Sequence, residues 1–300
     1  MTFPYLNETQ DLTEAVRANA GGSFIQLPDG VCHYELFSPS FVWPGGRLVV
    51  LVHGFSVPYF IWDPTFDFLS RSGFRVLRYD LFGRGYSDRP RVRYDIHLFV
   101  RQLRDLLDAL DLHEPVTIAG LSMGGPISAA FVEKYPERVA SHILVDPAGA
   151  KPIELSPVLR LAKIPVLSDL AFGLASEETL VKSAADDFYD PALVEQFIAQ
   201  YRPQMKFKGF KRAILSTMRS NMLGDFSSIY RRVGEMRKPT LLFWGRNDTT
   251  VPFAHSDKLR ALLPHAEFHA IEGVGHIPHY EKPDEVNPIL LAFLNSPNAS

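Results

Sequence analysis

The chain has 300 residues, of which 46% are hydrophobic and 22% are charged, an ordinary balance for a globular protein with a large buried core. Its formal net charge of −3 provides no basic surface for nucleic acid or anionic lipid, so we expect neither partner. The single cysteine, Cys32, cannot form an internal disulfide, and the first 20 residues contain no apolar signal-peptide core. No apolar run approaches the roughly 18 residues of a membrane helix. These features predict a cytoplasmic protein without stable membrane insertion.

The first predicted element is a β-hairpin. Two strand-like runs, Ser23–Leu27 and Val31–Phe37, flank Pro28-Asp29-Gly30, and Asp-Gly between such runs favours a tight turn. Short apolar runs then recur without polar alternation, as expected for strands buried on both faces of a parallel sheet. These runs are Leu48–Val52, Phe74–Arg78, Val116–Ala119, His142–Val145, Thr240–Phe243 and Ala266–Ile271.

Helical stretches separate the predicted strands. The clearest of these helical stretches has an apolar stripe, from Leu98 to Leu110, opposite charged residues such as Arg101 and Asp105. Further helices are predicted at Ile127–Tyr135, Ser256–Leu263 and Glu285–Leu294. Alternating strands and helices predict a mostly parallel sheet with right-handed crossovers, to which the opening hairpin adds antiparallel strands at one edge.

This alternation stops near Ala150 and resumes near Arg237. The intervening sequence is apolar and helical, and its predicted helical stretches are Leu155–Leu174, Ser176–Ala185, Pro191–Tyr201 and Phe210–Met222. An insertion of this size between two strands is most simply a helical cap over the carboxyl edge of the sheet. We therefore predict a core domain of residues 1–150 and 237–300, with a cap of residues 151–236.

The motif Gly120-Leu121-Ser122-Met123-Gly124 follows an apolar strand and precedes a helix rich in small residues. A serine on a tight strand-to-helix turn is held in strained backbone geometry, and the residues two before and two after it must be small for the turn to close. The N-terminus of the following helix then directs its free N–H groups at the reacting centre. The motif occurs once, in the required context, and predicts Ser122 as a nucleophile.

A serine hydroxyl is a poor nucleophile unless a base takes its proton and a carboxylate orients that base. On a strand–turn–helix of this kind the acid and then the histidine follow the serine in the chain. Asp248 and His276 both come just after predicted strands, at the edge where open α/β sheets place their sites. Asp146 also follows a strand and competes as the acid, whereas His279 competes less well because it lacks the flexible Gly-x-Gly that precedes His276.

The loop His53-Gly54-Phe55 leaves the predicted strand Leu48–Val52. A loop at this place supplies one oxyanion-hole N–H, and the residue after the nucleophile supplies the other. We therefore assign the oxyanion hole to the backbone amides of Phe55 and Met123. His53 is expected to brace the loop rather than act as a base.

Together these residues resemble the α/β-hydrolase superfamily, in its serine-nucleophile carboxylesterase and lipase-like branch, from about Phe24 to Leu294. Asp80-Leu81-Phe82-Gly83-Arg84-Gly85-Tyr86-Ser87 and Trp62, in the first helix, match further pieces of the family pattern. The resemblance implies an α/β fold with a mostly parallel eight-stranded sheet, helices on both faces and a helical cap inserted after the sixth strand. It also implies that the Asp80–Ser87 loop is structural, although its glycines alone would weakly suggest a phosphate loop.

Serine at position 122 separates the chain from the aspartate-nucleophile dehalogenase and epoxide-hydrolase branches. The first prediction is a carboxylesterase that cleaves small to medium esters through an acyl-Ser122 intermediate. C–C bond hydrolysis of dienoic ketones, monoacylglycerol lipolysis, lactone hydrolysis and cofactor-free perhydrolysis remain alternatives, as does a binding protein that has lost catalysis. The bulky apolar loop Phe55-Ser56-Val57-Pro58-Tyr59-Phe60 argues against C–C hydrolases, which usually carry a Gly-rich loop there.

The sequence also contains residues of the types that bind metal ions. His265, Glu267 and His269 share one face of a predicted strand, and His276-x-x-His279 follows. The triad needs no metal, and such strand-face residues are usually solvated, so we expect neither metal nor cofactor. The expected partner is a small-molecule ester, bound by a monomer or small homo-oligomer.

Overall fold

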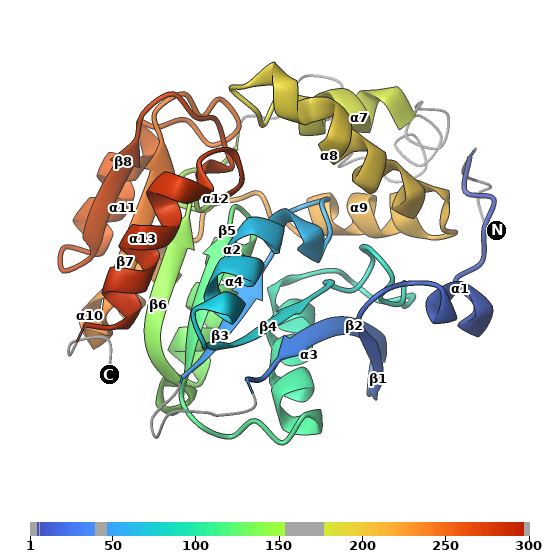
Figure 1. Ribbon diagram of the computed structural model, residues 1–300, viewed down its shortest axis with the longest axis horizontal. Helices are drawn as coiled ribbons and strands as arrows, with labels where there is room; N and C mark the ends of the chain where they lie inside the picture. Colours follow the sequence, from blue (N-terminus) through green and yellow to red (C-terminus); the bar gives the residue numbers. More distant parts are fainter. Residues whose placement is uncertain (1–4, 6, 40–46, 154–176, 297–300) are drawn as a thin grey trace.

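An eight-stranded sheet forms the centre of the computed structural model, which describes residues 5, 7–39, 47–153 and 177–296 (Figure 1). The strand order is β1-β2-β4-β3-β5-β6-β7-β8. The pairs β1–β2 and β2–β4 are antiparallel, and the other five pairs are parallel. The strands are β1 Ser23–Leu27, β2 Gly30–Phe37, β3 Leu48–Val52, β4 Arg75–Tyr79, β5 Val116–Leu121, β6 Val139–Val145, β7 Thr240–Gly245 and β8 Glu267–Ile271.

The predicted hairpin and the predicted sheet are confirmed, with strand ends that differ by a few residues. Leu27 pairs with Gly30, so Pro28 and Asp29 form the tight turn between β1 and β2. The strand predicted from His142 begins earlier, at Val139, because this segment continues the parallel pairing with β5. Both antiparallel strands lie at one edge of the sheet, as the sequence predicts.

Helices cover both faces of the sheet (Figure 1). On one face α2 packs against β4 and is joined by α12 and α13, and on the other α4 packs against β5 and contacts α3 and α10. Asp95 begins α3 by accepting a hydrogen bond from the Leu98 N–H at 3.0 Å. The described helices outside the inserted segment are α1 Glu14–Ala18, α2 Asp63–Arg71, α3 Ile96–Ala109, α4 Gly124–Lys134, α11 His255–Leu262, α12 Pro278–Glu281 and α13 Pro283–Leu294.

The central strands are buried on both faces, which explains their unbroken apolar sequence. All five residues of β3 are fully buried. Val49 and Leu51 point into the hydrophobic cluster beneath α2 and α13, whereas Leu48, Val50 and Val52 point into the cluster beneath α3 and α4. Two apolar layers therefore hold the sheet rigid and fix the positions of its strand ends.

The inserted segment between β6 and β7 is helical where the structure describes it. It contains α7 Glu177–Ala185, α8 Val194–Tyr201, α9 Phe210–Arg219 and α10 Ser227–Met236, with the 3-10 turns η4 Pro191–Leu193 and η5 Arg202–Lys206. Helices α7, α8 and α9 lie together along one edge of the sheet (Figure 1). In contrast, α10 packs against α4 and α11, so its contacts are with the core although the sequence places it in the cap. The predicted helical stretch 155–174 lies outside the described residues.

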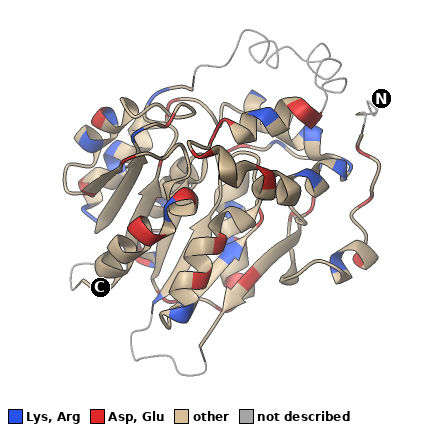
Figure 2. Cartoon of the chain, turned by 45° about the horizontal axis from the view of Figure 1, so that its top comes forward, with Lys and Arg blue, Asp and Glu red and all other residues tan. Residues whose placement is uncertain are grey.

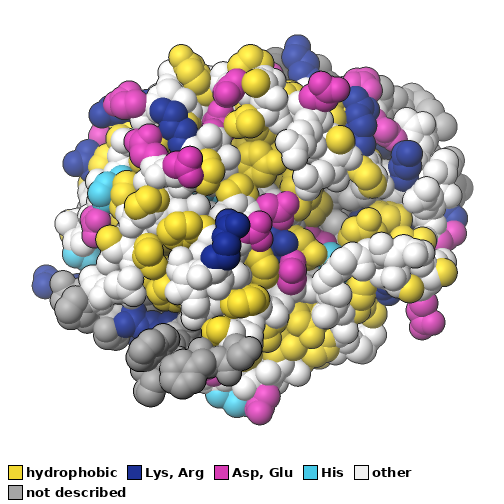
Figure 3. Space-filling model, viewed as in Figure 1, with side chains coloured by type: hydrophobic (Ala, Val, Ile, Leu, Met, Phe, Trp, Pro, Cys, Tyr) yellow, Lys and Arg dark blue, Asp and Glu magenta, His cyan; other side chains and the backbone are white. Residues whose placement is uncertain are grey.

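Charged residues of both signs are interspersed along the chain (Figure 2). The space-filling view of one face shows the same mixture, with hydrophobic side chains scattered among charged ones (Figure 3). None of the described helices is long and apolar enough to cross a membrane.

Candidate active site

Ser122 lies on the turn between β5 and α4, as the sequence predicts. Its φ of 53° is in the left-handed region, which is strained for a residue with a side chain. The turn is held on both sides, because the Ser122 N–H donates to the Val145 carbonyl at 3.0 Å and its carbonyl accepts from the Gly125 and Ala148 N–H groups. The serine is 7% exposed, so it is reached only through the site.

The two glycines of the motif are required by close packing. A Cβ at Gly120 would lie 2.3 Å from the Gly124 carbonyl oxygen, and a Cβ at Gly124 would lie 2.3 Å from the Val52 carbonyl oxygen. Neither approach is possible for a larger residue without moving the backbone. Residue size at these two positions therefore determines whether the turn can form.

His276 and Asp248, which the sequence pairs with Ser122, lie in contact. Nδ1 of His276 is 2.8 Å from Oδ2 of Asp248, while Oδ1 of Asp248 accepts from the Thr250 and Val251 N–H groups at 2.8 Å each. The Nε2 atom of His276 has no hydrogen-bond partner among the described residues. Burial alone would lower the pKa of His276, but Asp248 and the nearby Asp187 carboxylate raise it to about 9.

Asp146, the competing acid, is also buried here. Its Oδ1 accepts from the Gly245 N–H at 2.8 Å, and its Oδ2 has no hydrogen-bond partner among the described residues. Carboxylate oxygens of Asp146 and Asp248 and a ring nitrogen of His276 lie within 4.8 Å of one another. Burial and the Asp248 carboxylate raise the pKa of Asp146 well above its ordinary value. Only Asp248 makes the direct contact with His276 Nδ1.

The loop that carries Phe55 is held by three side chains. His53 accepts from the Leu81 N–H through Nε2 at 2.9 Å and contacts the Gly54 carbonyl through Nδ1. Arg84 donates to the Phe55 carbonyl at 2.8 Å, and Gln204 donates to the Ser56 carbonyl at 2.8 Å. Burial lowers the pKa of His53 to about 4, which keeps its ring neutral. These contacts agree with a bracing role for His53. Arg84 belongs to the Asp80–Ser87 loop, for which a structural role is predicted, whereas no sequence signal identified Gln204.

A cavity of about 80 Å³ adjoins Ser122. It brings together residues from the loop after β3, the nucleophile turn, the end of α7 and the two loops after β7 and β8: Gly54, Phe55, Ser56, Val57, Ile61, Leu121, Ser122, Ser183, Ala184, Asp187, Thr250, His276 and Ile277. Met123 is buried beside the nucleophile, at the start of α4. The inserted helices therefore form part of the wall of a cavity at the carboxyl edge of the sheet.

The remaining histidines near the site are structural. His279 is buried against Trp62, with ring centroids 4.2 Å apart, and contacts the Ile61 carbonyl through Nε2. Burial lowers its pKa to about 3, so it is neutral. Trp62 itself ends the turn η1 Tyr59–Trp62, just before α2.

The strand-face residues considered as metal ligands are not brought together. His269 contacts Glu267, but His265 contacts the Lys238 carbonyl instead. Within the described ranges, Asp146, Asp248 and His276 are the one group of three whose potential ligand atoms lie within 4.8 Å of one another. In this group, Asp248 already occupies the Nδ1 atom of His276.

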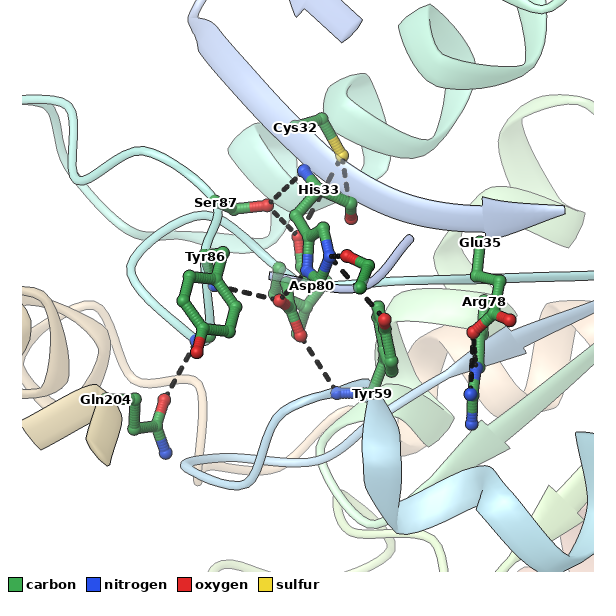
Figure 4. A network of polar contacts seen from close by, with 12 residues as sticks. Cys32, His33, Glu35, Tyr59, Arg78, Asp80, Tyr86, Ser87 and Gln204 are labelled. Atoms are coloured by element: carbon green, nitrogen blue, oxygen red, sulfur yellow. Dashed lines mark hydrogen bonds and ion pairs between the residues drawn. The ribbon is translucent and has the colours of Figure 1, made fainter. Parts of the chain in front are cut away.

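The carboxylate of Asp80 occupies the space inside the glycine-rich loop after β4 (Figure 4). Asp80 contacts His33 Nδ1 at 2.6 Å and accepts from the Tyr59 and Tyr86 N–H groups at 2.9 Å. Burial opposes ionisation, but His33, His53 and the Tyr59 N–H hold the pKa of Asp80 below its ordinary value. A Cβ at Gly85 would lie 1.9 Å from Asp80, so the glycine makes room for a carboxylate of the chain itself. This arrangement ties β2, η1 and the loop together and agrees with the predicted structural role.

Residues 47–283 match the family model described as alpha/beta hydrolase fold, and this span contains Ser122, Asp248 and His276. The chain belongs to the α/β-hydrolase fold family. This hydrolase is 30% identical over 240 residues to the 2-hydroxy-6-oxo-2,4-heptadienoate hydrolase of Pseudomonas putida, an alignment that covers 77% of this chain and 83% of that protein.

Solved structures similar to this hydrolase agree on the fold. A meta-cleavage product hydrolase from Pseudomonas fluorescens has a TM-score of 0.75 and 26% identity, and the match covers 91% of this chain and 97% of that chain. An esterase from Exiguobacterium antarcticum has a TM-score of 0.72 at 19% identity, covering 92% and 100%. By their names, the first two of these relatives are hydrolases of a dienoate and of a meta-cleavage product, and the third is an esterase.

Proposed function

We propose that this hydrolase cleaves carboxylic esters of small to medium size, with Ser122 as nucleophile, His276 as base and Asp248 as the acid that orients it. The observation that carries the proposal is the His276–Asp248 contact, which leaves His276 Nε2 without a partner in a cavity shared with Ser122. Helices α7 to α9 act as the cap in this proposal.

In the first half of the reaction, His276 Nε2 takes the Ser122 proton while Oγ attacks the ester carbonyl. The backbone amides of Phe55 and Met123 stabilise the oxyanion, each donor contributing about 3–4 kcal/mol. Collapse breaks the bond to the alcohol, which leaves with the proton from His276. Water then loses a proton to His276 and attacks the acyl carbon, releasing the acid and restoring Ser122.

C–C hydrolysis is the second candidate function, and the named activities of the relatives favour it. A dienoate substrate carries a carboxylate, for which a site usually provides a basic partner. No Lys or Arg is among the described residues that line the cavity, and Asp187 is. This charge arrangement is our reason to rank ester hydrolysis first.

The test compares p-nitrophenyl acetate, butyrate and octanoate with a 2-hydroxy-6-oxodienoate. We expect Ser122→Ala to lower ester turnover at least about 1,000-fold and to abolish labelling by a fluorophosphonate. Ser72→Ala, at an exposed serine, serves as the control and should retain both. Undiminished turnover in Ser122→Ala would refute the mechanism. If the dienoate is cleaved about 100-fold more efficiently than every ester, C–C hydrolysis replaces ester hydrolysis as the function.

A further inference from the structure

Asp187, at the end of the segment that follows α7, meets the triad histidine from the cap side. Its backbone carbonyl accepts from the His276 N–H at 2.8 Å, and its Oδ1 accepts from the Thr250 hydroxyl at 2.6 Å. The side chain is partly exposed and lines the cavity beside Ser122. Asp187 therefore anchors the His276 loop through its backbone and offers its carboxylate to the cavity.

The charges around the cavity are unbalanced. Asp187 is the one acidic residue among its described lining residues, and none of these is Lys or Arg. Burial raises the pKa of Asp187 to about 6, against the opposing effects of His276 and the Thr250 hydroxyl, so the group is ionised at pH 8. Asp187 and Asp248 thus place two carboxylates around one imidazole. Among the described residues that line the cavity, Asp187 thus contributes a negative charge that no lining Lys or Arg balances.

We propose that Asp187 selects substrates by charge, favouring esters whose alcohol carries an ammonium group and disfavouring esters that carry a carboxylate. The proposal rests on Ser122 as the nucleophile of the proposed function. Its physical basis is that a charge in a partly dehydrated cavity interacts far more strongly with a substrate charge than it would in water. By the same reasoning, we expect Asp187 to repel an anionic dienoate.

A structural role is the competing explanation, because Asp187 supports both Thr250 and His276. The variant Asp187→Asn separates the two. The amide oxygen of asparagine can still accept from Thr250, and the backbone contact to His276 does not depend on the side chain. Only the negative charge is removed. The matched control is Asp186→Asn, which removes the same charge from an exposed neighbour that does not line the cavity.

The experiment measures the inactivation rates of the full-length protein at pH 8 by two phosphonate esters. One has a choline leaving group, and the other has the uncharged 3,3-dimethylbutyl group of the same shape. We expect the wild type and Asp186→Asn to prefer the choline compound about tenfold after correction for intrinsic reactivity, and Asp187→Asn to lose most of this preference. Butyrate esters of the same two alcohols should show the same ratio in kcat/KM.

The possible outcomes separate the two proposals. An unchanged ratio in Asp187→Asn, with inactivation of Ser122 still occurring, overturns charge selection and leaves the nucleophile intact. A fall in both rates by the same factor also overturns charge selection, because it shows a structural role alone. Absence of inactivation in the folded wild type overturns Ser122 as nucleophile and with it the proposed function. Hydrolysis of neither ester, together with a charge-dependent inactivation ratio, contradicts ester turnover but supports charge selection.

Discussion

Asp248 and Asp146, the two candidates for the triad acid, both lie near His276, and their environments differ. Asp248 directs one oxygen to His276 Nδ1 and the other to two backbone N–H groups. Asp146 has one backbone donor, and its second oxygen has no partner among the described residues. A histidine is oriented by the carboxylate that it touches, so Asp248 is the better candidate for the triad acid.

This difference gives a prediction about the two acids. We expect Asp248→Asn to lower kcat of ester hydrolysis about 1,000-fold or more, because the amide no longer stabilises the imidazolium. Asp146→Asn should lower it less than about tenfold, since the carboxylate in contact with His276 Nδ1 is that of Asp248. Steady-state kinetics with p-nitrophenyl butyrate would check this, with circular dichroism to verify folding. The reverse order of effects would assign the acid to Asp146.

The raised pKa of His276 predicts an alkaline activity profile. Burial opposes the protonated form, but Asp248 and Asp187 outweigh it and hold the pKa at about 9. A base must be neutral to accept the Ser122 proton, so kcat/KM should rise with pH and level off above pH 9. The rise should approach about tenfold per pH unit below pH 8. A profile that is flat between pH 7 and 9 would contradict this environment for His276.

Among the elements, the β5–turn–α4 unit constrains the site most. The strained φ of Ser122 is maintained by hydrogen bonds from β6 and the following loop, while Gly120 and Gly124 allow the strand, turn and helix to close on one another. The close packing of backbone atoms against these two glycines therefore determines the position of the serine oxygen.

Gly120→Ala should destabilise this unit. Its Cβ would lie within 2.5 Å of both the Gly124 carbonyl and the Ser128 hydroxyl, and relief requires movement of the turn. Overpacking of this kind costs about 1–3 kcal/mol, and activity should fall further because Ser122 moves. Gly21→Ala is the control, because no atom lies within 4 Å of the Cβ it introduces. Thermal unfolding and ester kinetics would measure both effects, and an active Gly120→Ala with an unchanged Tm would disprove the packing argument.

On the scale of the whole molecule, the inserted segment and the core both contact the loop that carries Phe55. Gln204, in η5, accepts from the Gly85 N–H and donates to the Ser56 carbonyl, each at 2.8 Å. Arg84 joins the Phe55 carbonyl to the Thr217 hydroxyl of α9. The position of the proposed oxyanion donor is thus set by contacts that cross from core to insertion.

Gln204→Leu removes both contacts of this residue at nearly constant size. One oxyanion-hole donor typically stabilises the transition state by about 2.7–4 kcal/mol. A displaced donor loses part of this stabilisation, so we expect kcat to fall about tenfold or more. KM should change less, since Gln204 does not line the cavity. Gln200→Leu, at an exposed position of α8, is the control. If both variants turn over esters as the wild type does, the insertion does not position the loop.

Local sequence determines the strands, most helices and the nucleophile turn, because each depends on residues adjacent in the chain. Unbroken apolar runs such as Leu48–Val52 can be buried only on both faces, and Gly-x-Ser-x-Gly closes only one kind of turn. The sequence also predicts that Ser122, Asp248 and His276 each follow a strand and lie at the same edge of the sheet, because the carboxyl ends of parallel strands meet at one edge.

Only the tertiary structure decided which side chains share the site. Contacts of Asp187 and Gln204 join residues separated by tens to more than a hundred positions, and no local pattern marks them. The motif that contains Arg84 predicts a structural loop but not the contact of Arg84 with Thr217. The packing of α10 on the core, against the predicted cap boundary, depends likewise on which helix surfaces meet. The pKa values of His276 and Asp187 arise from burial and neighbouring charge, which exist only in the folded chain.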